Sequence, residues 1–187
     1  MLGRARIMFP TRNAKRVQAV RTGTALLVLP RSTAELDEAV KRAKAIVTRR
    51  AAMASAASLV PVPGLDIAVD IAAVMKLIPE INREFGLTPE QIEKLSPAKR
   101  LMVYKSIVAV GSLMIGKLIT KEIAIEVLKT VGVRMTAKQV GKYVPVAGQA
   151  LSVALGFAAM KYVGHQHIKD CRRVIEATFD HTPEGRR

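Results

Sequence analysis

Segments with helical apolar spacing alternate along this chain with short segments rich in Pro or Gly. From Ser32 onward, apolar residues recur every three or four positions, which is the period of an amphipathic helix. Ser32 and Glu35 have the spacing of a capping box, so the pattern predicts a first helix over residues 32–58. From residue 51 this helix is apolar on all sides, which predicts that its far end is buried in the interior or in a membrane.

Two proline-containing corners each precede a strongly apolar helix. The first corner, residues 59–64, leads into a helix from Leu65, and the second, residues 143–148, leads into a last helix over 149–178. Pro fixes an extended backbone and Gly allows a sharp turn, so we expect both corners to direct an apolar helix into the core. The residues that define these corners are Pro61, Pro63, Gly64, Pro145 and Gly148.

The helix after the first corner is almost entirely apolar over residues 65–78, which predicts burial on every side. Pro79 should kink this helix, and Gly86 is placed to end it. Asp66 and Asp70 fall in its first two turns, where negative charge complements the helix dipole. The alternative interpretation makes the two carboxylates an acid/base pair or a cation site.

Two more helix starts follow in the middle of the chain. Thr88 and Gln91 have capping-box spacing before a short helix over residues 89–95. Ser96 is followed by a proline, which is favourable at the first helical position. The apolar spacing then predicts a long helix over residues 97–119.

The helical pattern resumes after Thr120 and is expected to stop at Gly132. Thr136 is expected to cap a short helix that ends at Tyr143. No stretch sustains the strict alternation of apolar and polar residues that is typical of a strand. The sequence therefore predicts an all-α protein, a multi-helix bundle with two Pro-Val-x-Gly corners leading into buried apolar helices.

Composition limits the size and make-up of the core. Half of the 187 residues are apolar, four per cent are aromatic and none is Trp, so aliphatic side chains must form most of the core. A chain of this length can bury a real core as one domain. We expect a single helical domain over residues 32–179, a basic, partly disordered arm over 1–31 and a polar tail over 180–187. The arm alternatively resembles an organelle transit peptide, or residues upstream of the true start.

The charge is strongly positive, with 30 Lys and Arg against 15 Asp and Glu and a formal net charge of +15. Such a chain is attracted to an anionic membrane surface, to nucleic acid or to an acidic protein. Few aromatic residues and no recognisable nucleic-acid motif weigh against nucleic acid. The predicted contacts to an anionic membrane are in the arm: Arg4, Arg6, Arg12, Lys15, Arg16 and Arg21.

Residues 111–118 nearly spell a phosphate-binding loop of nucleotide-binding proteins. Leu118 stands where that loop needs a hydroxyl for Mg²⁺, and the segment lies inside a helical pattern instead of following a strand. We therefore expect its two glycines and Ser112 to allow close helix packing, with Lys117 reaching outward.

His165, His167 and Cys171 suggest a metal site only weakly. His167 and Cys171 are one helical turn apart and share a face, whereas His165 points elsewhere. A structural zinc site needs four ligands, and the chain has no second Cys. We predict no metal, no cofactor and no catalytic residues, with Cys171 a partly buried small apolar residue. A single Cys also fits a reducing compartment and a cytoplasmic location.

Three apolar stretches approach the hydropathy of a membrane span, over residues 51–79, 106–119 and 143–163. The first is interrupted by prolines and aspartates, and the second is too short. The third contains Pro145 and Gln149 but is otherwise about long enough. We expect a bundle that touches the membrane peripherally, and the alternative is an integral membrane protein with hydrophobic hairpins.

The stretch from Val60 to Asp70, with the following Phe85-Gly86-Leu87, resembles the C-terminal helical region of immunity-related GTPases. It is also similar to the helical domain attached to bacterial Era-like GTPases. The stretch from Lys142 to Gln149 resembles the second hallmark of that region. The resemblance covers residues 51–175, with Ala147 in place of a second Pro. It implies a helical domain, membrane association and work beside a GTPase, but no nucleotide binding, because the GTPase motifs are absent.

The sequence therefore predicts a non-enzymatic helical protein that associates with an anionic membrane surface, with a separately encoded GTPase as a candidate partner. The first alternative is a soluble protein-interaction module or accessory subunit without membrane contact. The second is an integral membrane protein. A nucleic-acid binder is supported only by charge.

Overall fold

Every regular element in the described part of the chain is an α-helix. The computed structural model describes residues 29–57, 65–139 and 148–179, with side chains described over 29–56, 70–130 and 154–179. The all-α multi-helix prediction is confirmed. The helices are α2 (Thr33–Ala57), α3 (Leu65–Glu84), α4 (Pro89–Glu93), α5 (Pro97–Val110), α6 (Lys121–Gln139) and α7 (Gly148–Phe179).

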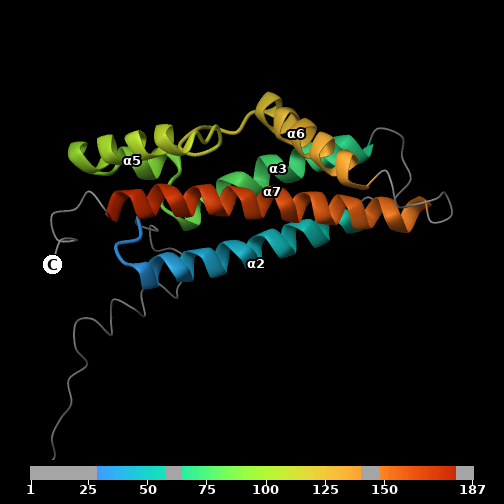
Figure 1. Ribbon diagram of the computed structural model, residues 1–187, viewed down its shortest axis with the longest axis horizontal. Helices are drawn as coiled ribbons and strands as arrows, with labels where there is room; N and C mark the ends of the chain where they lie inside the picture. The colour runs from blue at the N-terminus through green and yellow to red at the C-terminus, as the bar shows by residue number, and fades with distance from the viewer. Residues whose placement is uncertain (1–28, 58–64, 140–147, 180–187) are drawn as a thin grey trace, which may run out of the picture.

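The last helix, α7, is the element around which the others pack. It runs the length of the molecule, with α2 along one side and α5 and α6 one after the other along another side (Figure 1). Helices α2, α3, α5 and α6 all contact α7. Aliphatic side chains from these helices form one buried core, whose members include Leu36, Val47, Leu77, Ile81, Val103, Ala124, Met160 and Ile175.

Several helix ends are fixed by the residues that the sequence singled out. The Glu35 amide donates to Ser32 Oγ at 3.2 Å, while the Glu35 carboxylate accepts from the backbone of Arg31. Thr88 makes the complete capping box with Gln91. Gly86 ends α3 in the left-handed region, with φ of 70°, where Gly has no steric penalty. The predicted starts of α2 and α4 and the end of α3 are therefore confirmed. The predicted burial of the far end of α2 on all sides is wrong, because Ala52, Met53 and Ala56 are exposed and only one side of α2 packs against the core.

The predicted long helix over residues 97–119 is wrong, because α5 ends at Val110. Gly111 adopts φ of 72°, and its N–H donates to the carbonyls of Ile107 and Val108. This is a left-handed helix ending, which apolar spacing alone does not reveal. Residues 111–120 form a non-helical connection to α6, in which Gly116 has a second positive φ of 68°.

The predicted stop at Gly132 is also wrong. Helix α6 continues through that glycine to Gln139, so no separate helix begins at Thr136, and residues 140–143 lie outside the described residues. A helical Gly costs only about 1 kcal/mol relative to Ala. Packing of α6 against α3 and α7 overrides that cost. Ser96 precedes α5 as predicted, but its side chain makes no capping hydrogen bond.

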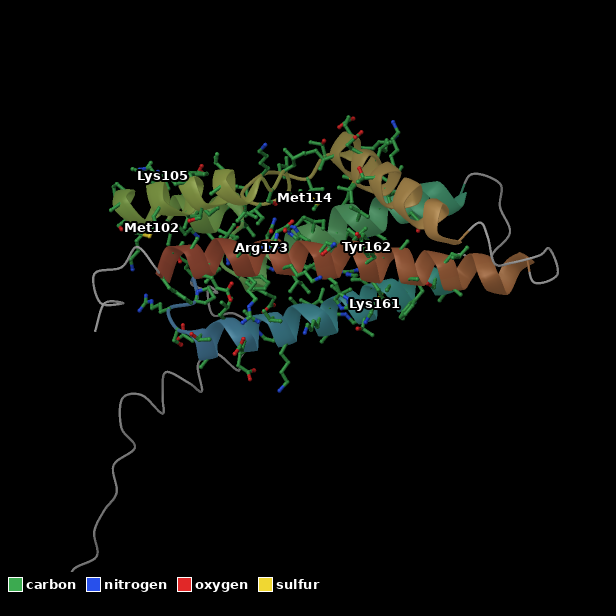
Figure 2. The ribbon with its side chains drawn as sticks, viewed as in Figure 1. Met102, Lys105, Met114, Lys161, Tyr162 and Arg173 are labelled. Carbon is green, nitrogen blue, oxygen red and sulfur yellow. The ribbon has the colours of Figure 1, made fainter. Side chains whose placement is uncertain are left out.

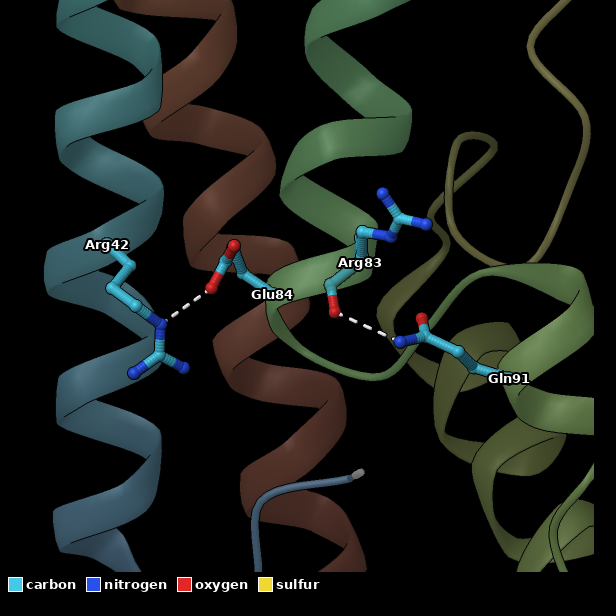
Figure 3. A network of polar contacts seen from close by, with 4 residues as sticks. All are labelled: Arg42, Arg83, Glu84 and Gln91. Atoms are coloured by element: carbon cyan, nitrogen blue, oxygen red, sulfur yellow. Dashed lines mark hydrogen bonds and ion pairs between the residues drawn. The ribbon is translucent and has the colours of Figure 1, made fainter. Parts of the chain in front are cut away.

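Two ion pairs join α2 to α3. Arg42 Nε lies 2.6 Å from a Glu84 carboxylate oxygen (Figure 3). Arg50 pairs with Glu80 two turns further along α2. Figure 3 also shows the Gln91 amide donating to the Arg83 carbonyl, at 3.2 Å, which ties α4 to the end of α3. These contacts hold the C-terminal end of α3, which carries the buried Asn82.

Helices α2 and α7 pack closely where Gly164 of α7 meets Val47 of α2. A Cβ atom added at Gly164 would lie 2.5 Å from Val47 Cγ2 and 2.7 Å from Val47 Cγ1. The β-branched Val cannot rotate away without meeting its own helix. Gly164 therefore sets the distance between the two helices.

We expect Gly164→Ala to lower the free energy of unfolding by about 1 kcal/mol or more in a urea titration. An overpacking cost toward the upper end of about 1–3 kcal/mol exceeds the helix-propensity gain of about 1 kcal/mol. Gly156→Ala is the matched control on the same helix, because an added Cβ there meets nothing within 4 Å. That variant should gain about 0.5–1 kcal/mol. If both variants were stabilised, the close contact would be refuted.

Candidate functional site

Most of the residues predicted to contact a membrane or form the corners lie outside the described residues. These are Arg4, Arg6, Arg12, Lys15, Arg16, Arg21, Pro61, Pro63, Gly64 and Pro145. Gly148 is the first residue of α7. Helix α3 begins at Leu65, so Asp66 and the half-buried Asp70 do fall in its first two turns.

A fully buried polar cluster joins α3, α7 and the connection between α5 and α6. His167 Nε2 lies 2.8 Å from Asn82 Oδ1, and Cys171 Sγ lies 3.6 Å from both atoms. The other end of the Asn82 amide donates to the Met114 carbonyl at 2.9 Å. Asn82 therefore holds the 111–120 connection against the core of the bundle.

This arrangement fixes the proton positions. Because Asn82 Nδ2 donates to a carbonyl, Asn82 Oδ1 must face His167 as an acceptor. Nε2 of His167 therefore carries the hydrogen, and Nδ1, which has no partner within the described structure, carries the lone pair. Burial lowers the pKa of His167 to about 3, so the imidazole is neutral at neutral pH.

The cluster contains a Cys, a His and an Asn, but its environment suits structure and not nucleophilic chemistry. Burial raises the pKa of the Cys171 thiol well above its usual range, and the thiolate is the form that attacks substrates. Cys171 and His167 are both fully buried. Cys171 is thus more deeply buried than predicted, and it belongs to a polar cluster.

The shared face of His167 and Cys171 and the separate position of His165 are confirmed. Among the described residues, no group of three or more His, Cys, Asp or Glu side chains is arranged to hold a metal ion. The segment that resembles a phosphate-binding loop has its amides engaged: Gly116 N–H donates to the Leu87 carbonyl and Ser112 N–H to the Ile107 carbonyl. These amides cannot cradle a phosphate.

Large apolar side chains are exposed mainly on α5 and the connection after it. Eight such side chains are exposed among the described residues, and five of them lie between residues 101 and 118. Val108 is 80% exposed and Leu118 is 77% exposed. We call these five residues the apolar face: Leu101, Tyr104, Val108, Leu113 and Leu118.

The apolar face exists because α5 is apolar on two opposite sides. Val103 and Ile107 pack into the core, while Leu101 and Val108, two turns apart, point outward on the opposite side. The connection then folds back over α5. A Cβ at Gly116 would lie 3.3 Å from Ile107 Cδ1 and 4.0 Å from Tyr104 Cε1, so the connection packs against α5 beside Tyr104.

The apolar face is set in a positively charged segment. Between Glu93 and Glu122 the chain has six basic residues and no acidic one: Lys94, Lys99, Arg100, Lys105, Lys117 and Lys121. Figure 2 shows Lys105 on the side of α5 that faces away from α7. This charge pattern, interleaved with apolar residues, is the signal in the sequence that could have located the surface. The prediction of one continuous helix over residues 97–119 did not indicate this surface.

In the described part of the chain, no helix combines the length and the hydropathy that a membrane span requires. Comparison with known protein families, with curated proteins and with solved structures finds no match to this chain.

Proposed function

We propose that this protein is a non-enzymatic helical module that docks peripherally on an anionic membrane surface. The observation that carries the proposal is the exposure of the apolar face on a segment that has six basic residues and no acidic one between Glu93 and Glu122. Exposed apolar side chains that lie together mark interaction sites, and adjacent lysines favour a negatively charged partner. A GTPase acting at the same membrane is the partner that the family resemblance suggests.

The expected energy comes from two sources. Each Lys or Arg close to an anionic bilayer contributes about 1 kcal/mol, and this contribution falls within a Debye length. Each fully transferred Val or Leu side chain contributes about 1.5–3 kcal/mol. Leu113 directly precedes Met114, whose carbonyl accepts a hydrogen bond from Asn82, so Asn82 holds the connection beside Leu113. Residues 1–31, with their many cations, would add attraction to the same surface.

We expect the protein to co-sediment with vesicles containing phosphatidylserine and much less with neutral phosphatidylcholine vesicles. Val108→Ser combined with Leu118→Ser should weaken binding at least about tenfold, since two apolar side chains are lost. Met53→Ser is the matched control, because Met53 is also exposed, by 57%, but lies on α2. Circular dichroism should show that all variants keep their helices.

Equal binding to neutral and anionic vesicles, or none to either, would contradict the proposal. Equal losses for the Met53 variant and the double variant would show that the apolar face is not the site. If vesicles do not bind and the apolar face instead mediates co-purification with a protein, the function is that of an interaction module.

A further inference from the structure

A second basic surface lies where α2 and α7 run side by side. Lys161 Nζ lies 2.9 Å from Thr48 Oγ1, and Arg172 pairs with Asp37 at 3.4 Å. These two contacts fix an antiparallel register in which residue numbers rise along α7 as they fall along α2. Lys44, one turn before Thr48, therefore lies opposite His165, one turn after Lys161.

We call Lys44, Lys161, His165 and Lys169 the basic seam. On α7, positions 161, 165 and 169 are each one turn apart and share a face. In the part of the chain that the structure describes, none of the three lysines has a carboxylate partner. The nearby acids are engaged elsewhere, since Asp170 pairs with Arg173 and Asp37 with Arg172.

The three lysines of the basic seam act on His165. The pKa of His165 is lowered by partial burial and then by Lys161, Lys44 and Lys169. Bringing like charges together without an acid between them is unfavourable, and a bound anion would relieve this repulsion. The close contact of Gly164 with Val47 lies beneath the seam and holds the two rows of side chains together.

We propose that the basic seam binds a phosphate group, with the ammonium groups of Lys44, Lys161 and Lys169 neutralising its charge. Three ammonium groups and an imidazole suit a dianionic phosphate. Thr48 holds Lys161 in position, because its hydroxyl accepts from Lys161 Nζ and donates to the Lys44 carbonyl. No bond is made or broken. The site is independent of the membrane docking proposed above.

The basic seam and the apolar face lie on different sides of α7. Figure 2 shows Lys161 on the side of α7 toward α2, while Lys105 lies on the far side of α5. A flat bilayer against the apolar face would therefore leave the basic seam uncovered. The phosphate group could belong to a soluble molecule or to a lipid headgroup of a second membrane.

The test is NMR titration of the His165 ring protons with inorganic pyrophosphate, using sodium chloride of equal ionic strength as the reference. We expect saturable shifts of the His165 signals at millimolar pyrophosphate and a titration midpoint that moves to higher pH, because the bound anion favours the protonated ring. The signals of the buried His167 should not move. Lys161→Gln and Lys44→Gln should each weaken binding by about two- to fivefold.

Lys105→Gln is the matched control, because it removes the same charge from the other surface and should leave the pyrophosphate titration unchanged. Unchanged His165 signals would overturn the proposal, as would shifts that sodium chloride reproduces or that Lys105→Gln reduces as much as Lys161→Gln. These outcomes are distinct from failure of membrane docking, which depends on Val108 and Leu118.

A second experiment, with vesicles containing phosphatidic acid, identifies the source of the phosphate. It uses the Val108→Ser, Leu118→Ser double variant, in which docking by the apolar face is removed. Binding that Lys161→Gln weakens would support a lipid phosphate. Pyrophosphate binding without such vesicle binding would support a soluble phosphate. Absence of both would refute the site.

Discussion

Lowering the pH from 7 to 5 should reduce the free energy of unfolding by about 2 kcal/mol through His167 alone. Burial lowers the pKa of this imidazole in the folded protein to about 3, against an ordinary value of 6.5. Between these values the unfolded chain takes up a proton that the folded chain excludes. The free energy of unfolding therefore rises with pH between about 3 and 6.5. The contribution of His167 is fully present above about 6.5 and is lost progressively as the pH falls below that value.

The measurement is a series of urea titrations at pH 7, 6 and 5. This window lies above the range where carboxylates such as Glu80, whose pKa is lowered chiefly by a hydrogen bond from Arg50, begin to take up protons. His167→Gln should flatten the pH dependence, whatever its effect on stability at pH 7, because glutamine cannot take up a proton.

His165→Gln is the matched control for that series. His165 lies two residues away on the same helix but is partly exposed, and its pKa is lowered by partial burial and by the neighbouring lysines. Most of the slope should survive in this variant. A wild-type protein equally stable at pH 5 and pH 7 would contradict the burial of a neutral His167, and so would an unchanged slope in His167→Gln.

Asn82→Leu should lower the free energy of unfolding by about 3–5 kcal/mol at pH 7. Leu has a similar size, so the loss comes mainly from hydrogen bonds and not from a cavity. The substitution leaves the buried His167 Nε2–H and the carbonyl of the half-buried Met114 without Asn82 as their partner. Each such orphaned group costs about 1–3 kcal/mol. Faster hydrogen exchange at the Gly116 amide should accompany the loss, since Asn82 holds that connection.

Ser55→Ala is the comparison for Asn82→Leu. Ser55 is also a buried polar residue, but its hydroxyl has no partner among the described residues, so its removal loses no hydrogen bond. This variant should be neutral or slightly stabilising, because Ala also favours the helix. A cost below about 1 kcal/mol for Asn82→Leu would mean that the network contributes little.

The sequence predicted helix ends correctly where the capping interaction joins residues close together in the chain. Ser32, Thr88 and Gly86 act within three or four residues of their partners, so their roles could be inferred without knowledge of the fold. The same reasoning failed at Gly111 and Gly132. Either glycine could end a helix, and packing of the surrounding segments decides which one does.

The candidate surfaces were predictable only in part. The positive charge predicts an anionic partner, and the contacts predicted from the sequence lie in the arm over 1–31, mostly outside the described residues. The apolar face could be located only once the structure showed that α5 ends at Val110 and that only one side of α5 is covered. The basic seam could be located only from the antiparallel register of α2 and α7, which brings together residues more than a hundred positions apart in the sequence.

The sequence by itself determined that this protein is helical, basic and built around an aliphatic core, because periodicity, capping and composition are local or additive properties. Only the tertiary structure decided which residues of similar type serve the core and which face outward. Asn82, His167 and Cys171 form one buried cluster because α3 and α7 bring them together across more than eighty residues. Val103 and Val108 differ for the same reason: α7 covers one side of α5 and leaves the other uncovered.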